Sequence, residues 1–347
     1  MPAISTPAKV LVTGANGFIA AWVVRTLLEN GFSVRGTVRE ESKSTFLRNL
    51  LKDDVERGTL EFVVVPNMTN TGAFDNAVKG VNAIVHPASP VHFRADDPNE
   101  VIEPAVKGAV GVLESALKYA GPQLKRVIFM SSTGAVVNTP YTGTFDEHSW
   151  DEGCIAEVAE KGRDASPMIK YYASKTLAEK AVWDFVERNK HRLTWDLVVT
   201  IPSYVFGPIL SNARTPSELG SSMFSLYNNV LSNTKSMEER ASFQFEWTDV
   251  RDIAEAQLNA LRTPEAGGQR FIMVSEPFTW LDWCGTVNSL KLPGINAPSS
   301  TEYKGIPYKL RFDCTKARTV LGIELHHGRA ETAKDIIDDF KERGFLK

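Results

Sequence analysis

The sequence predicts an α/β fold: a doubly wound parallel sheet with helices on both faces and a second, smaller lobe. Three observations support this prediction. From Lys9 onward, short runs rich in β-branched residues alternate with longer helical patterns. A glycine-containing turn follows the first of these runs, and the alternation breaks after Ile201 at Pro202, Gly207 and Pro208. A chain of 347 residues is also longer than one core usually supports, which favours a second lobe.

Six strands are expected before the alternation breaks, each followed by a crossover to the next. They are residues 9–13, 32–38, 60–65, 82–86, 126–131 and 195–201. A helix is expected in each of the first four intervals, ending at Asn30 in the first and running from about Val101 to Tyr119 in the fourth. A further helix should span about Pro167 to Asn189. Right-handed crossovers would place ligands beyond the carboxyl ends of these strands.

The remaining sequence is assigned to the two lobes by its pattern. Residues 243–261 resemble a strand and a helix that return to the main sheet. The dinucleotide-binding Rossmann domain is therefore expected at residues 7–202 plus 243–264. The smaller, substrate-binding domain is expected at residues 203–242 plus 265–347.

Composition excludes several classes of partner and site. The formal net charge is −3 and no run of Lys and Arg occurs, so neither nucleic acid nor an anionic membrane is expected as a partner. Cys154, Cys284 and Cys314 are widely spaced, which argues against a disulfide framework and a metal site. No signal peptide and no membrane-spanning stretch is recognisable, so we expect a cytoplasmic protein, either a monomer or a homodimer.

The turn after the first strand has the features of a dinucleotide-binding loop. Gly14 permits a tight turn, Gly17 lets the backbone approach a pyrophosphate, and the small Ala20 lets helix and strand pack closely. The amino terminus of the following helix would then face the phosphates. Asn16, Phe18 and Ile19 complete the candidate loop.

The end of the second strand predicts which dinucleotide binds. An NAD site usually offers an acidic residue here to hold the ribose hydroxyls, but residues 32–39 contain none. Instead Arg39 and Lys43 supply two cations suited to a ribose phosphate, which favours NADPH. The alternative is that both are solvated charges paired with Glu40 and Glu41.

Candidate catalytic residues lie on the helix at residues 167–189 and at the end of the fifth strand. Tyr171 and Lys175 are one helical turn apart, and a lysine ammonium beside the phenol would lower its pKa towards the range useful for acid catalysis. Ser131, Ser132 and Thr133 place hydroxyls where a substrate carbonyl could be held. A surface coincidence and ordinary turn chemistry are the respective alternatives.

With these motifs in order, the chain resembles the extended short-chain dehydrogenase/reductase family. The resemblance is strongest to its branch of fungal and yeast NADPH-dependent carbonyl and methylglyoxal reductases, related to plant dihydroflavonol reductases. It covers nearly the whole chain through the segments TGANGFIA, VRGTVREESK, VIFMSSTGAV, YYASKTLAEKAVWDF, IPSYVFGP and TDVRDIAEA. A longer signature around the tyrosine, present in plant hydroxycinnamoyl-CoA reductases, is not matched, which disfavours that substrate.

The resemblance implies a role for each candidate residue. Ser132 would orient the carbonyl, Tyr171 would protonate the forming alkoxide, and Lys175 would lower the phenol pKa and hold the nicotinamide ribose. By the same likeness the remaining cofactor contacts would be Arg39 and Lys43 at the adenosine phosphate, Asn67 and Met68 at the adenine, Ala88 and Ser89 along the dinucleotide, and Pro202 at the nicotinamide. Asn67 stands where the family commonly has an acid, and its amide can still bond adenine.

The substrate and two alternative functions remain open in the sequence. Phe93, Thr133, Tyr204 and Phe206 are candidates for lining the substrate pocket, with core packing as the equal alternative for the aromatic residues. The expected activity is reduction of a small aldehyde or ketone to an alcohol at the expense of NADPH. The alternatives are an NAD-dependent nucleotide-sugar epimerase or dehydratase, and a non-catalytic NADP-binding regulatory protein.

Overall fold

A computed structural model describes residues 4–89, 95–232, 234–299, 305 and 307–346. Its centre is a seven-stranded sheet in the order β10-β7-β5-β4-β1-β2-β3, and every neighbouring pair is parallel. The strands are β1 (Lys9–Val12), β2 (Ser33–Val38), β3 (Leu60–Val64), β4 (Ala83–His86), β5 (Arg126–Met130), β7 (Asp196–Pro202) and β10 (Gln269–Met273). This confirms the doubly wound parallel sheet and all six predicted strands.

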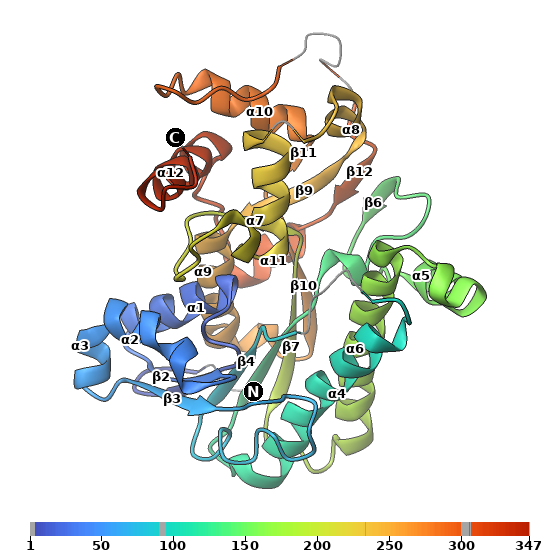
Figure 1. Ribbon diagram of the computed structural model, residues 1–347. Helices are drawn as coiled ribbons and strands as arrows, with labels where there is room; N and C mark the ends of the chain where they lie inside the picture. The colour runs from blue at the N-terminus through green and yellow to red at the C-terminus, as the bar shows by residue number, and fades with distance from the viewer. Residues whose placement is uncertain (1–3, 90–94, 233, 300–304, 306, 347) are drawn as a thin grey trace.

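Helices cover both faces of the sheet, as Figure 1 shows. One face carries α1 (Phe18–Glu29) and α9 (Val250–Arg262), which pack against each other. The other carries α4 (Asn99–Ser115), which continues as one wider turn over Ala116–Ala120, and α6 (Pro167–Asn189). Successive strand residues alternate between the two cores: in β1, Leu11 packs towards α4 and α6, whereas Val10 and Val12 pack towards α1 and α9.

The interval between β3 and β4 differs from the prediction. Residues 66–82 are all described, and they form consecutive turns instead of the expected helix. Gly72 and Gly80 adopt positive φ angles of 75° and 74°, which interrupt any helix over this short stretch. Between β2 and β3, by contrast, helical structure is present as η1 (Glu41–Ser44), α2 (Thr45–Leu50) and α3 (Lys52–Glu56).

The strand expected to return to the main sheet is placed elsewhere. β9 (Phe245–Asp249) lies between β8 (Tyr204–Phe206) and β11 (Glu276–Phe278) in a separate three-stranded sheet, so this prediction was wrong. All five β9 residues are buried in this smaller part of the molecule, where Trp247 packs against Trp283. The following helix α9 does return to the main sheet, and β10 supplies its additional edge strand.

The other elements of the smaller part surround this second sheet, above the main sheet in Figure 1. They are η5 (Pro216–Glu218), α7 (Ser221–Leu226), η6 (Tyr227–Leu231), α8 (Met237–Ser242), α10 (Trp280–Ser289) and α12 (Arg329–Glu342). Nearer the main sheet lie η3 (Thr133–Ala135), α5 (Glu152–Lys161), η4 (Gly162–Asp164), η7 (Pro264–Ala266) and α11 (Thr315–Leu321). The parallel pair β6 (Gly143–Phe145) and β12 (Leu310–Phe312) adjoins the second sheet (Figure 1), where Phe312 packs against Phe245 of β9.

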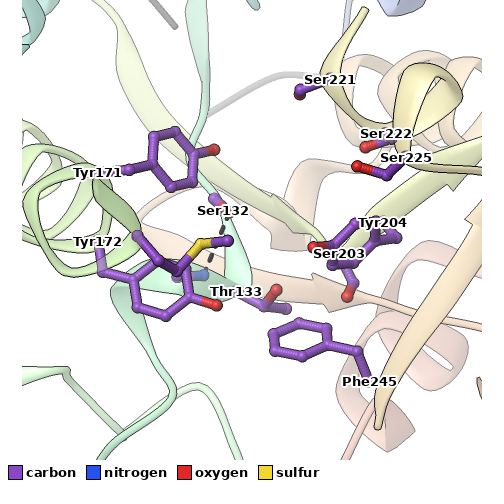
Figure 2. Close-up of a pocket in the computed structure, with 12 residues that line it drawn as sticks. Ser132, Thr133, Tyr171, Tyr172, Ser203, Tyr204, Ser221, Ser222, Ser225 and Phe245 are labelled. Atoms are coloured by element: carbon purple, nitrogen blue, oxygen red, sulfur yellow. Dashed lines mark hydrogen bonds between the residues drawn. The ribbon is translucent and has the colours of Figure 1, made fainter. Parts of the chain in front are cut away.

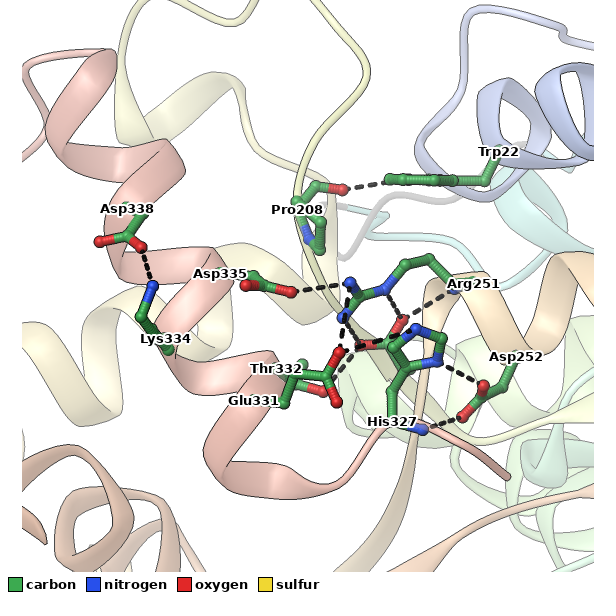
Figure 3. A network of polar contacts seen from close by, with 11 residues as sticks. Trp22, Pro208, Arg251, Asp252, His327, Glu331, Thr332, Lys334, Asp335 and Asp338 are labelled. Atoms are coloured by element: carbon green, nitrogen blue, oxygen red, sulfur yellow. Dashed lines mark hydrogen bonds and ion pairs between the residues drawn. The ribbon is translucent and has the colours of Figure 1, made fainter. Parts of the chain in front are cut away.

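A polar network joins α12 to the start of α9 (Figure 3). The Arg251 guanidinium donates to both carboxylate oxygens of Asp249 at 2.9 Å and to Asp335 on α12 at 2.7 Å. The Thr332 hydroxyl donates to the fully buried Asp249 at 2.7 Å. His327 Nδ1 lies 2.6 Å from the buried carboxylate of Asp252. These contacts tie the carboxyl-terminal helix to the sheet-bound helix α9.

Over the part of the chain that the structure describes, no helix is both long and apolar enough to cross a membrane. The same residues hold no cluster of metal-ligating side chains. Cys154, Cys284 and Cys314 are all buried and free.

Candidate active site

A long groove of about 1100 Å³ runs past the carboxyl ends of β1, β2, β4, β5 and β7. All residues that the sequence proposed as cofactor contacts line it: Gly14, Asn16, Gly17, Phe18, Ile19, Arg39, Lys43, Asn67, Met68, Ala88, Ser89, Tyr171, Lys175 and Pro202. The location is as expected for a doubly wound sheet. The described lining also includes residues 219–222 from the smaller part, which no sequence pattern indicated.

The glycine turn is shaped for close approach of a ligand to the backbone. Gly14 has φ +60°, and a side chain there would place its Cβ 3.2 Å from the Cβ of Ala88. A Cβ on Gly17 would lie 3.1 Å from the Gly14 carbonyl oxygen, to which the Gly17 N–H donates at 2.8 Å. Gly17 also begins α1 without a side-chain cap, so the free N–H groups of this helix are available to an anion.

A second layer of hydrogen bonds holds this turn in place. The Thr13 hydroxyl accepts the Ala88 N–H at 3.3 Å and lies 2.8 Å from His86 Nδ1. Burial and the nearby Lys175 charge lower the pKa of His86 to about 3. His86 is therefore neutral, and its ring shares a hydrogen bond with the Thr13 hydroxyl through Nδ1. This buried histidine stabilises the turn through its hydrogen bond with Thr13 and does not line the groove.

The charges along the groove favour an anionic ligand. Arg39, Lys43 and Lys175 are the only charged side chains in its described lining, and all three are cationic. Glu41 pairs with Arg48 at 2.8 Å, while Glu40 stays 3.9 Å from Lys43. Arg39 is exposed and forms no ion pair with the described residues. The alternative was that both cations pair with Glu40 and Glu41. The structure contradicts it for Arg39.

The three candidate catalytic side chains meet at the inner end of the groove. Ser166 caps the amino terminus of α6 and Pro167 occupies its first turn, which sets the helix that carries Tyr171 and Lys175. Lys175 Nζ lies 5.9 Å from the centre of the Tyr171 ring. Ser132 is the second residue after β5, and its hydroxyl hydrogen-bonds the Tyr171 phenol and accepts the Gly134 N–H at 3.1 Å.

The electrostatics of this pair differ from the prediction. Burial raises the pKa of Tyr171, and the hydrogen bond from Ser132 only partly opposes this shift. The net lowering of the phenol pKa that the sequence led us to expect is therefore not what the structure shows, because desolvation of the phenol dominates. Burial also lowers the pKa of Lys175 to about 8, against the opposing charge of Glu179. The phenol consequently keeps its proton at neutral pH, as a general acid must.

Glu179 is a buried residue of this site that the sequence analysis missed. It lies one turn beyond Lys175 on α6 and is fully buried. Its carboxylate accepts the Ser131 hydroxyl at 2.5 Å and pairs with Arg270 Nε on β10 at 2.6 Å. The signal was available, since Tyr171, Lys175 and Glu179 repeat every fourth residue along one helix face.

A smaller pocket of about 220 Å³ opens beside Ser132 and Tyr171 (Figure 2). Of the proposed substrate contacts, Thr133 and Tyr204 line it. Phe206 does not: it is fully buried and packs edge-on against Trp283 with ring centres 5.0 Å apart, so its assignment to the pocket was wrong. Phe93 lies outside the described residues. Figure 2 shows side chains that the sequence did not indicate on the opposite wall, namely Ser203, Ser221, Ser222, Ser225 and Phe245.

Comparisons with known proteins show the family to which the chain belongs. A model of the NAD-dependent epimerase/dehydratase family matches residues 10–274. The chain belongs to this family. A ketoreductase of Aspergillus niger is 34% identical over 331 residues, 91% of this chain and 92% of the relative. An NADPH-dependent methylglyoxal reductase of Saccharomyces cerevisiae is 31% identical over 350 residues, 95% of this chain and 96% of the relative.

A solved structure of the yeast methylglyoxal/isovaleraldehyde reductase, complexed with NADPH, has the same architecture. Its TM-score is 0.85 at 30% sequence identity, and the match covers 97% of this chain and 100% of that one. These findings confirm the resemblance to extended short-chain dehydrogenase/reductases that the sequence motifs indicated.

Proposed function

We propose that this protein reduces an aldehyde or ketone to an alcohol at the expense of NADPH. The observation that carries the proposal is that two cavities meet at Tyr171 and Ser132. Among the described residues, the charged ones that line the groove are all cationic, and none that lines the small pocket is charged. A dinucleotide phosphate fits the first cavity and a neutral carbonyl compound fits the second. The relatives named as NADPH-dependent reductases support the same assignment.

In this mechanism the protein positions the carbonyl and supplies the proton. NADPH, when bound in the groove, supplies the hydride. The Ser132 hydroxyl donates a hydrogen bond to the substrate oxygen, which stabilises the charge that develops there. Tyr171, protonated because burial raises its pKa, transfers its proton to that oxygen. Lys175 stabilises the resulting phenolate and would also bind the nicotinamide ribose.

The cofactor assignment rests on the groove itself. Arg39, which is exposed and unpaired among the described residues, and Lys43 would bind a phosphate on the adenosine ribose. The described lining of the groove contains no acidic residue that would favour NAD. Asn67 and Met68 would contact the adenine, and Pro202 the nicotinamide. The cradle at Gly14 and Gly17 would hold the pyrophosphate.

The charge of the inner pocket argues against a nucleotide-sugar epimerase or dehydratase. Such an enzyme must hold a diphosphate on its substrate, yet the described lining of the inner pocket contains no Lys or Arg. A purely regulatory NADP-binding protein would have no need for the Ser132, Tyr171 and Lys175 constellation.

The test is to follow NADPH and NADH absorbance with a panel of aldehydes, α-keto aldehydes, β-keto esters and aryl ketones, using wild type and Tyr171→Phe. We expect faster oxidation of NADPH than of NADH. The variant should lose about a hundredfold to ten-thousandfold in turnover while still binding NADPH. Near-normal turnover by the variant, or tight NADPH binding without oxidation by any carbonyl compound, would contradict the proposal.

A further inference from the structure

A second cavity adjoins the inner pocket and has no role in the function proposed above. This outer cavity has a volume of about 810 Å³, and three side chains, Met168, Tyr172 and Phe245, line both it and the inner pocket. We refer to these three residues as the partition. We propose that the outer cavity holds the distal part of the substrate, and that the partition determines how bulky a tail the enzyme accepts.

The size of the inner pocket supports this proposal. Cavities that enclose drug-sized ligands usually measure about 300–1,000 Å³. The inner pocket, at about 220 Å³, suits only the part of a carbonyl compound next to the reacting carbon. A larger substrate must therefore extend past the partition, and the outer cavity has the volume to receive it.

The three members of the partition differ in how easily they can move. Tyr172 is fixed: it lies so close to the backbone that a Cβ on Gly134 would come within 2.5 Å of its ring. Phe245 is buried on β9 and packs edge-on against Tyr204, with ring centres 5.4 Å apart. Met168 is only half-buried, lies in the first turn of α6 and has an unbranched, adaptable side chain. Met168 is thus the residue that a tail can displace.

The lining of the outer cavity indicates the chemistry of that tail. Half of its described lining residues are apolar, and besides the partition these are Pro140, Tyr141, Ile169, Ala241 and Phe243. Its described charged residues are Glu157, Glu238 and Lys309, so carboxylates outnumber ammonium groups, and the inner pocket adds no charge. An anionic tail is therefore disfavoured. The proposed substrate class is a neutral aldehyde or ketone with a bulky apolar, preferably aromatic, tail; this rests on the carbonyl reductase function proposed above.

The test uses three methyl ketones with the same reacting end: butanone, benzylacetone, and the analogue of benzylacetone in which a biphenyl group replaces the phenyl ring. The readout is the ratio of kcat/KM for the biphenyl ketone to kcat/KM for butanone. Ser242 is an exposed residue that lines the outer cavity, so Ser242→Trp places a bulky ring there. We expect this variant to lower the ratio by about tenfold or more, because the substrate loses about one buried aromatic contact. Met168→Ala should raise the ratio.

The matched control is Ser289→Trp. Both serines are exposed near the end of a helix, and the hydroxyl of each donates to the carbonyl three residues earlier, Ser242 to Glu239 at 3.3 Å and Ser289 to Thr286 at 2.7 Å. Ser289 lines neither cavity, so its variant should keep the wild-type ratio. Thr142→Trp, from another exposed lining position, replaces Ser242→Trp if that variant does not fold.

The outcomes separate this inference from the function on which it depends. If the wild type reduces butanone, but filling the outer cavity changes the ratio no more than Ser289→Trp does, the outer cavity is not part of the substrate site. If the wild type oxidises NADPH neither with the three ketones nor with any other carbonyl compound, the proposed reductase function itself fails.

Discussion

Lys175 is required for the proposed function, but burying its charge lowers the stability of the folded protein. Burial lowers its pKa from the ordinary 10.5 to about 8, so folding disfavours its charged form. Below about pH 8 the side chain is charged in both the folded and the unfolded protein, and the full cost of burying the charge is present. As the pH rises from 8 to 10.5 the folded protein loses this proton first, and the cost disappears.

We therefore expect Lys175→Met to stabilise the cofactor-free protein at pH 7, by up to about 3 kcal/mol at 1.36 kcal/mol per pKa unit, while abolishing turnover. Urea unfolding of both proteins at pH 7 and pH 10 measures this. The difference between them should shrink at the higher pH. An equal difference at both pH values would show that the charge of Lys175 is not the cause.

Arg39 carries the prediction on cofactor choice. A hydrogen bond to a charged group contributes about 1.5–3 kcal/mol, so Arg39→Ala should weaken NADPH binding by about tenfold to a hundredfold. NADH lacks the ribose phosphate and should bind almost as before. Titration of protein fluorescence with each cofactor measures both affinities. An equal loss for NADPH and NADH would assign Arg39 to a contact that the two cofactors share.

The residue identities at the site were predictable, but the protonation energetics were not. Gly14, Arg39 and Lys175 follow strand ends or lie on one helix face, and such placement can be inferred from local sequence. The raised pKa of Tyr171 depends on how deeply the assembled protein buries the phenol. That quantity depends on segments distant in the chain, including β8 and α7, whose residues form the facing wall of the inner pocket.

At the scale of elements, the buried Glu179–Arg270 pair connects α6 to the edge strand β10. Arg270 also donates to the carbonyls of Glu147 and Ser149 and lies over the Trp150 ring at 3.8 Å. Removing one partner of such a pair leaves a buried charge uncompensated, which typically costs about 3–5 kcal/mol. Glu179→Gln should therefore lower the free energy of unfolding strongly.

Glu187→Gln is the control for this variant, because Glu187 lies on the same helix in an exposed ion pair with Lys190 and should change stability little. The double variant Glu179→Gln/Arg270→Met removes both charges and should recover part of the loss. Chemical unfolding followed by circular dichroism measures all three. Arg270→Met alone completes the comparison. If the double variant lost as much stability as Glu179→Gln and Arg270→Met together, Glu179 and Arg270 would not act as a pair.

The elements themselves were predictable to the extent that local patterns determine them. The helix at Pro167–Asn189 and the six strands have clear periodicity or composition and were found. The strand at Phe245–Asp249 was recognised as a strand but assigned to the wrong sheet, because strand pairing depends on partners far away in the chain. The turns at residues 66–82 show that an alternating pattern does not require a helix in every crossover.

At the scale of the whole molecule, the site depends on two parts of the fold meeting. Most of the groove and the catalytic residues come from the main sheet and its helices, whereas residues 219–222, Ser225 and Phe245 come from the smaller part and form the facing wall. The sequence could indicate the first half because glycine and catalytic motifs have known positions in such sheets. It could not indicate the second, since an irregular segment acquires its place only through tertiary packing. The lobe boundaries inferred from the sequence accordingly stay a prediction.

The polar contacts in Figure 3 connect the smaller part of the molecule to the main sheet. Arg251→Met would leave the fully buried Asp249 carboxylate without its cation and break the contact to Asp335 on α12, at a cost of about 3 kcal/mol. Hydrogen exchange should then accelerate in α12, because this helix loses an anchor to α9, while β1 and β4 stay protected. Arg25→Met is the control. It removes an exposed ion pair with Glu29 and a cation–π contact with Trp22, both within α1, and should leave exchange in α12 unchanged. Faster exchange throughout the protein in Arg251→Met would instead mean that the two parts unfold as one unit.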